Sequence, residues 1–326
     1  MNSQTHILLT GAGFTYNFGA PLAKEVWNLI LNCPSLRACP RLRETLLQNL
    51  DFESVYHTVI LSADYSPLEK RAMNDAVQSA FAFLDEKIRT WQHQDHAVNI
   101  YGVQRLLARF AGDRKSPGFI FTLNQDLFVE RYYADGPSPI LLGFNKTVHL
   151  PGGSRQRLEK DHWLTVPPSP LDLLSLTRHH SFYYVKLHGS FNWRRTSGAS
   201  DSSYMVIGRG KSEQIAAEPL LAGYLSLFER VLNSGKKRLL VCGYGFRDEH
   251  INEVIGSAIK NERMELFVLS PQSSSSFRDS LDSVPCGATI WSAVRHFPYS
   301  LQSLFPAASQ AGTPEWQNLC ESYFAL

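Results

Sequence analysis

The sequence lacks several features that would assign it to a common class of protein. None of its five scattered cysteines forms a C-x-x-C pair, so neither a structural zinc site of the usual spacing nor a disulfide framework is predicted. Its 32 Lys and Arg residues nearly balance 30 Asp and Glu residues, which gives no general basic charge for direct nucleic-acid binding. The N-terminus has no basic segment followed by an apolar stretch, and no run approaches the roughly 20 apolar residues of a membrane span. We therefore expect a cytoplasmic protein with reduced thiols and no metal.

What is present is an alternation of apolar segments. Short, continuously apolar runs predict buried strands, and apolar stripes of helical period predict helices between them. Strands that alternate with helices indicate an α/β fold with a doubly wound, mostly parallel, Rossmann-like sheet. The predicted strands are residues 7–10, 119–122, 140–144, 183–187, 238–242, 266–269 and 289–291, and the predicted helices are 22–31, 68–91, 101–110, 218–232 and 249–259.

One interval interrupts this alternation. Between the first two predicted strands the sequence reads almost wholly as helix, over a length far greater than a single crossover needs. We predict one domain over residues 1–326, in which residues 34–112 form a helical insertion beside the sheet and residues 113–326 carry the remainder of the core. Residues 151–169 and 196–203 are rich in Gly, Pro or Ser, which predicts loops.

A glycine turn follows the first strand in "HILLTGAGFTYNFGAPLA". Gly11-Ala12-Gly13 breaks the strand, and a helix is expected after Gly19 and Pro21. The spacing is neither the G-x-G-x-x-G of dehydrogenases nor a P-loop, and no acidic residue follows about twenty residues later to hold a ribose. Glycines nevertheless let a backbone approach a pyrophosphate closely, beside the amides of a helix N-terminus. The alternative is a tight packing corner.

Polar side chains follow two other predicted strands. "FTLNQD" places Asn124 and Asp126 at the carboxyl end of a strand, where open α/β sheets bind ligands, although either residue can instead cap a helix. "YVKLHGSFNW" places His188 after a strand and before a glycine, where the alternative role is packing. With an ordinary pKa of about 6.5, such a histidine can accept a proton at cytoplasmic pH.

A second glycine turn occurs in "VCGYGFRDEHINEVI". Gly243 and Gly245 leave a predicted strand, and a helix begins near Asp248. This turn can form a second cradle for the same ligand, or Asp248 can be an ordinary helix N-cap.

Read in order, "GAGFTYNFGAPLA", "TLNQD", "KLHGSFNW" and "GYGFRDEHIN" resemble a sirtuin-like domain, in particular the branch in bacterial antiphage defence proteins that hydrolyse NAD. The matching blocks span residue 6 to about residue 270. Protein-deacylating sirtuins carry two C-x-x-C pairs for zinc, which this sequence lacks, and a Phe-Arg-Ser segment where Pro21-Leu22-Ala23-Lys24 stands here. These departures disfavour acyl-lysine deacylation.

The resemblance implies a role for each matching residue. Asn124 would order a water beside the nicotinamide ribose, Asp126 would hydrogen-bond the carboxamide, and His188 would contact the ribose hydroxyls as a general base. The implied NAD-binding residues are Gly11, Ala12, Gly13 and Thr15 on the pyrophosphate and nicotinamide-ribose side, Gly243, Tyr244, Gly245 and Asp248 on the adenosine side, and Ser270 at the adenine pocket.

The expected function is therefore an NAD hydrolase that releases ADP-ribose and nicotinamide and depletes NAD in abortive infection. The alternatives are an NAD-dependent deacylase or ADP-ribosyltransferase, and a non-catalytic subunit that binds NAD or ADP-ribose. Because an unregulated NAD hydrolase would exhaust the cofactor, we expect control by homo-oligomerisation or by a separate partner. The resemblance implies a HerA-type ATPase, or less often an Argonaute, as that partner. The helical insertion or the C-terminal segment, with Trp316, Leu319, Tyr323 and Phe324 at helical spacing, is the expected docking surface, unless those side chains are core.

Overall fold

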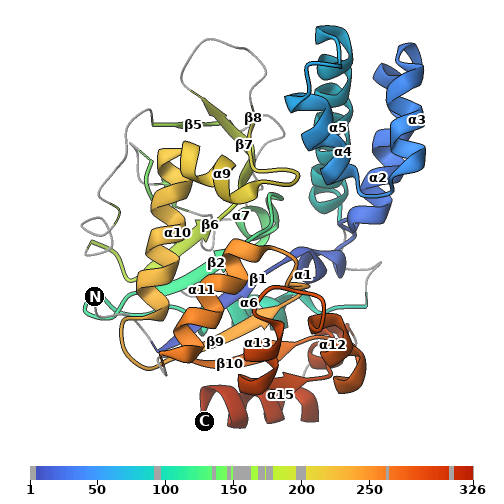
Figure 1. Ribbon diagram of the computed structural model, residues 1–326. Helices are drawn as coiled ribbons and strands as arrows, with labels where there is room; N and C mark the ends of the chain where they lie inside the picture. Colours follow the sequence, from blue (N-terminus) through green and yellow to red (C-terminus); the bar gives the residue numbers. More distant parts are fainter. Residues whose placement is uncertain are drawn as a thin grey trace.

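A mostly parallel sheet forms the centre of the molecule in the computed structural model, with a group of helices standing beside it (Figure 1). The structure describes residues 5–91, 97–133, 137–144, 148–149, 163–167, 173, 179–195, 203–261, 264–307 and 312–325. Within them, eight strands form the sheet in the order β11-β10-β9-β1-β2-β6-β3-β4, and every neighbouring pair is parallel except β3 and β4. The strands are β1 (His6–Thr10), β2 (Gly118–Thr122), β3 (Ile140–Leu141), β4 (Val148–His149), β6 (Phe182–Lys186), β9 (Lys237–Cys242), β10 (Met264–Leu269) and β11 (Val294–Phe297).

The predicted fold class is confirmed. All five residues of β2 and of β6 are buried, which explains why their sequences are largely apolar until their last residues, Thr122 and Lys186, rather than alternating. In Figure 1, α10 (Pro219–Leu232) and α11 (Glu249–Lys260) lie in front of the sheet. The other helices outside the helical group are α1 (Ala12–Tyr16), α6 (Ile100–Ala108), α7 (Phe128–Tyr132), α9 (Lys211–Ala217), α12 (Ser274–Leu281), α13 (Gly287–Ala293), α14 (Leu301–Leu304) and α15 (Pro314–Leu319), which continues into a π-helical turn at Cys320–Phe324.

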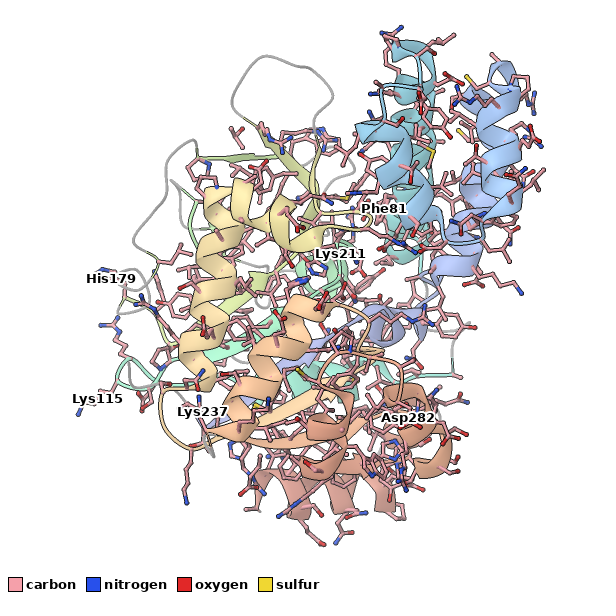
Figure 2. All side chains as sticks on the ribbon, viewed as in Figure 1. Phe81, Lys115, His179, Lys211, Lys237 and Asp282 are labelled. Carbon is pink, nitrogen blue, oxygen red and sulfur yellow. The ribbon has the colours of Figure 1, made fainter. Side chains whose placement is uncertain are left out.

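The helical module, as we call residues 23–89, stands to the upper right of the sheet in Figure 1. It contains α2 (Ala23–Leu31), a 3-10 helix (Pro34–Ala38), α3 (Pro40–Gln48), α4 (Phe52–Leu61) and α5 (Pro67–Arg89). Apolar side chains from residues 26–80 form a second core cluster, which Ile207 joins from outside the module. Phe81, labelled in Figure 2, packs against this cluster and against the main core. The core of the module is thus continuous with the main core. The predicted boundaries of the helical insertion, at residues 34 and 112, stay a prediction.

Two local predictions were wrong, and a third was incomplete. Residues 289–291 lie in α13, and the edge strand β11 follows at Val294–Phe297, because a three-residue apolar run does not distinguish helix from strand. The strand expected at 140–144 ends at Leu141, and the chain turns at Gly143, whose φ is +89°. The helix expected after Gly19 and Pro21 is α2, but a further short helix, α1, begins directly after Gly11.

A small second sheet was not anticipated. It has the order β5-β7-β8, with β5 (Leu164–Val166), β7 (Gly189–Arg195) and β8 (Ser203–Met205). β5 falls within the loop predicted at 151–169, of which residues 151–162 and 168–169 lie outside the described residues, as do residues 196–202 of the other predicted loop.

The C-terminal segment packs into the core. Leu319 and Tyr323 are fully buried, and the Tyr323 hydroxyl lies within hydrogen-bonding distance of the backbone oxygens of Ile7 in β1 and Arg238 in β9. Its apolar stripe therefore belongs to the protein's own core, and the expectation that it offers a docking surface was wrong. No helix in the described part of the chain is long and apolar enough to cross a bilayer.

Candidate functional site

The register of the sheet brings the ends of four strands to one edge. Thr10 of β1 pairs with Thr122 of β2 and with Cys242 of β9, and Thr122 also pairs with Lys186 of β6. The segments that follow these strands are those singled out in the sequence, and they emerge side by side. The candidate residues from four distant blocks are therefore gathered at the carboxyl edge, where ligands bind in sheets of this type.

The two glycine turns pack directly against each other. The Gly13 amide donates to the Gly243 carbonyl at 2.8 Å, and the Gly11 amide donates to the Cys242 carbonyl at 3.0 Å. A Cβ on Gly11 would lie 2.7 Å from the Gly243 oxygen, and one on Gly13 would lie 2.9 Å from the Gly243 Cα. Gly11 and Gly13 therefore fit the alternative role of a tight packing corner, because their amides already donate hydrogen bonds within the protein.

The second turn also has an open side. Gly243 has a φ of +71°, and a Cβ there would lie 2.1 Å from the Phe14 backbone nitrogen, so this position requires glycine. A Cβ on Gly245 would meet nothing within 4 Å. The backbone at Gly245 thus borders free space, as a ligand-facing position in the turn requires.

A chain of hydrogen bonds connects Asn124, Thr15 and Asp126. The Asn124 side-chain amide donates to the Gly11 carbonyl at 3.0 Å and to Thr15 Oγ1 at 3.2 Å, and the Thr15 hydroxyl donates to Asp126 Oδ2 at 2.9 Å. Asp126 Oδ1 accepts a bond from the Phe128 amide at 3.0 Å. These bonds fix the orientation of the Asn124 amide, and its side-chain oxygen forms no hydrogen bond with any described residue.

Buried charges surround Asp126. Lys186 donates to the Asp126 backbone oxygen and to Glu130 Oε1, the latter at 2.8 Å. Burial raises the pKa of Asp126, and the Lys186 charge with the bonds from Phe128 and Thr15 only partly offsets that shift. Burial likewise raises the pKa of Glu130. The site therefore favours the protonated carboxyl of Asp126 more than water does.

His188 lies in the turn between β6 and β7, facing a second histidine. Its Nε2 is 3.0 Å from Nε2 of His250, which lies in the first turn of α11. Burial lowers the pKa of His188 to about 3, and burial also lowers the pKa of His250. The expectation of an ordinary histidine pKa was therefore wrong, because desolvation disfavours the imidazolium, and both rings are neutral near pH 7.

Asp248 precedes α11 but does not cap it through its side chain. Its carboxylate instead accepts a bond from Lys211 Nζ at 2.8 Å, and Lys211 also pairs with Glu53 of α4 at 2.9 Å. Burial raises the pKa of Asp248, but attraction to His188 and Lys211 outweighs it, so the pKa is held below its usual range. This ion cluster links the helical module to the turn at the sheet edge, and Figure 2 labels Lys211 between those two parts.

The other predicted residues lie in the same region with different partners. The Tyr244 hydroxyl accepts a bond from the Asp248 amide at 3.0 Å and contacts Asn252, so it stabilises the turn. Ala12 opens α1 beside Gly11. Ser270 follows β10, and its amide donates to the Phe297 carbonyl at 3.1 Å, toward the β11 edge. Ser270 thus lies at the carboxyl edge of the sheet, as predicted, but it follows β10, which is separated by β9 and β1 from the strand that precedes Asn124.

Sequence reasoning missed three residues of this site. They are His250 and Asn252, which lie within the quoted "GYGFRDEHIN" block, and Lys211. The Asn252 side chain donates to the Phe246 carbonyl at 2.7 Å, which holds a residue whose φ is +55°. Buried polar residues in the first turn of a helix were the available signal for His250 and Asn252. Nothing local in the sequence marked Lys211, whose partners are distant along the chain.

The catalytic candidates are shielded from solvent. Asn124, Asp126 and His188 are 8%, 5% and 4% exposed. An open groove of about 630 Å³ lies beside α1, between Tyr16, Asn17 and Pro21 on one side and Phe83 and Lys87 of α5 on the other. No group of three or more His, Cys, Asp or Glu side chains suited to a metal occurs among the described residues.

A comparison with models of protein families matches residues 118–284 to a model described as SIR2-like domain. The match covers just over half of the chain and includes Asn124, Asp126, His188, the second glycine turn and Ser270. A search of curated proteins finds no match.

Proposed function

Because the chain belongs to the SIR2-like domain family, whose members bind NAD and are often NAD-dependent enzymes, we propose that it hydrolyses NAD to ADP-ribose and nicotinamide. The observation that supports this most is the sheet edge itself. There an amide of fixed orientation, a neutral histidine and a buried carboxyl group lie around the two glycine turns. This set can bind a nucleotide and orient a water without a metal ligand set.

The proposed chemistry suits these side chains. The C1′–N bond breaks with its electron pair moving to the pyridinium nitrogen, so nicotinamide leaves as a neutral molecule and C1′ becomes oxocarbenium-like. Water then adds to C1′ and loses a proton. The Asn124 side-chain oxygen, which has no partner among the described residues, is suited to accept a hydrogen bond from that water. Asp126, with its raised pKa, is suited to contact the carboxamide as donor or acceptor.

Activity is tested with the full-length protein. Asn124→Ala removes the oriented amide, so we expect NAD turnover to fall by on the order of 10²–10³-fold, as measured by product chromatography. Asn261→Ala is the matched control, since Asn261 is exposed at the end of α11 and bonds only at the surface. Melting curves of both variants establish folding. Wild-type protein that binds NAD tightly but leaves it intact for hours, alone and with its partner, would refute the proposal.

Acceptor assays distinguish the related reactions. The same bond cleavage begins deacylation and ADP-ribosyl transfer, and these differ only in what attacks C1′. Labelled NAD incubated with acylated and candidate acceptor proteins is expected to give free ADP-ribose. Label on an acceptor, or O-acyl-ADP-ribose, would favour transfer.

We also propose that assembly controls the activity, as a role in antiphage defence by NAD depletion requires. The shielding of Asn124 and His188 supports this, because a structural change on assembly can increase access to these side chains. The proposed partner is a second copy of the chain or a separate HerA-type ATPase, with an Argonaute less favoured. Five of the nine large hydrophobic residues exposed in the described part of the chain lie within the module: Leu47, Leu50, Leu61, Leu68 and Phe83.

A further inference from the structure

The contact between His188 and His250 restricts where protons can lie. Their Nε2 atoms are 3.0 Å apart, the ring planes are inclined by 49°, and both residues are buried. Two neutral imidazoles form such a contact only when one Nε2 carries a proton and the other does not. Each ring therefore fixes the tautomer of the other.

The proposed reaction distinguishes the two arrangements. Nδ1 of His188 forms no hydrogen bond with any described residue. If His188 donates through Nε2–H, that Nδ1 carries a lone pair and is the atom left to accept a proton. If His188 accepts instead, its Nδ1 carries the proton and the ring has no lone pair for the reaction. Only the first arrangement gives a ring that can act as a base.

We propose that His250 is a positioning residue that accepts a hydrogen bond from His188 Nε2–H and so keeps Nδ1 of His188 unprotonated for the reaction. The proton lost by the attacking water arrives at His188 Nδ1 as the Nε2 proton moves to His250 Nε2. His188 is again neutral, and the positive charge resides on His250. The starting pair is restored when the Nε2 proton returns from His250 to His188 and the Nδ1 proton of His188 leaves to solvent.

The charges around the pair suit this transfer. Asp248 lies two residues before His250, and its negative charge favours the protonated form of both histidines. Lys211 opposes protonation, but its bonds to Asp248 and to Glu53 of α4 partly neutralise it. Burial thus keeps both histidines neutral before the reaction. The nearby Asp248 carboxylate stabilises the imidazolium that forms when the pair takes up the proton.

The inference rests on the proposed hydrolase activity for its kinetic readout but not for its spectroscopic one. His250→Phe removes the acceptor while filling the space, and His250→Gln supplies an amide oxygen that can accept the same bond. His179→Gln is the control, since His179 is exposed and lies far from Lys211 in Figure 2. All variants are made in the full-length chain, and melting curves check their folding.

We expect His250→Phe to lower kcat for NAD by on the order of 10–100-fold with KM little changed, as for other groups that fix a histidine tautomer. His250→Gln should restore most of kcat, and the control should match wild type. Nitrogen-15 spectra of the imidazoles should show His188 protonated at Nε2 in the wild type and a mixture of tautomers in His250→Phe.

The outcomes separate the two proposals. If wild type leaves NAD intact, the proposed function fails, and the spectra alone decide the inference. A wild-type His188 protonated at Nδ1, or a spectrum of His188 unchanged by His250→Phe, would overturn it. An equal loss of kcat in His250→Phe and His250→Gln would also overturn the inference, because a hydrogen-bond acceptor at position 250 would then have no role.

Discussion

Gly243 shows how a single glycine joins the two turns of the site. Its φ of +71° excludes most side chains, and a Cβ at this position would lie only 2.1 Å from the Phe14 nitrogen. We expect Gly243→Ala to lower the free energy of unfolding by at least about 2 kcal/mol, from backbone strain and displacement of α1. Gly245→Ala, where a Cβ has free space, should change it by less than about 1 kcal/mol. Urea denaturation measures both, and equal losses would contradict the packing of the turns.

His188 predicts a pH dependence of stability. Its folded-state pKa of about 3 lies below the unfolded value of about 6.5, so on acidification the unfolded chain binds a proton that the folded chain does not. This contribution is fully present above about pH 6.5 and is lost as the pH falls toward 3. Asp126 and Glu130, whose pKa values are raised, contribute with the opposite sign.

The histidine contribution is isolated by a difference measurement. The free energy of unfolding of wild type and of His188→Gln is compared by urea denaturation between pH 5 and pH 7.5. We expect the wild type to lose more stability than the variant on acidification, by about 1–2 kcal/mol over this range. Parallel pH profiles would mean that His188 titrates normally in the folded protein.

Among the elements, strands were easier to predict than the contacts between their ends. β2 and β6 are buried throughout, and β1, β9 and β10 are buried at all but one position each, so an apolar run marks each of these strands. The run at 289–291 failed because α13 packs against α11, and helix packing selects the same apolar residues. Short strands such as β5 depend on pairing with β7 and leave little pattern of their own.

The candidate site was predictable only in part, for the same reason. Asn124, His188 and the second glycine turn follow recognisable strands, and the sheet register then brings them together. His250 is 62 residues from His188 in the sequence, and Lys211 is far from both Glu53 and Asp248. Such pairs are set by tertiary packing, which no local pattern encodes.

Lys211 pairs with Glu53 of α4 and with Asp248 at the start of α11, and the two ion pairs are expected to differ in their contribution to stability. The Asp248 side chain is 13% exposed and that of Glu53 is 37% exposed. Lys211→Met leaves Asp248 without its cation, so we expect the free energy of unfolding to fall by about 1–3 kcal/mol. Glu53→Gln removes a more solvated partner and should cost less than about 1 kcal/mol. Urea denaturation measures both, and a larger loss in the Glu53 variant would contradict this ranking.

At the scale of the whole molecule, the helical module combines a core of its own with several exposed large hydrophobic side chains. Its cluster from residues 26–80 is joined to the main core through Phe81 and Ile207. One connection to the site runs through Glu53 and Lys211, and a second runs through the buried ion pair of Asp85 in α5 with Arg131 in α7. A partner that binds the module is therefore in a position to move the turn that carries Asp248 and His250, which relates assembly to the state of the histidine pair.

This arrangement predicts which surface substitutions affect assembly. Leu61 and Leu68 flank the connection from α4 to α5 and are 69% and 57% exposed, so changing both to Lys should weaken association of the module without altering its fold. Tyr101→Lys is the control, because Tyr101 is 63% exposed but lies on α6, outside the module. Size-exclusion chromatography with light scattering is expected to show a smaller species for the double variant only, with NAD turnover reduced in parallel. A wild-type protein that is strictly monomeric and fully active would contradict control by assembly, whereas an unchanged oligomer in the double variant would place the interface elsewhere on the molecule.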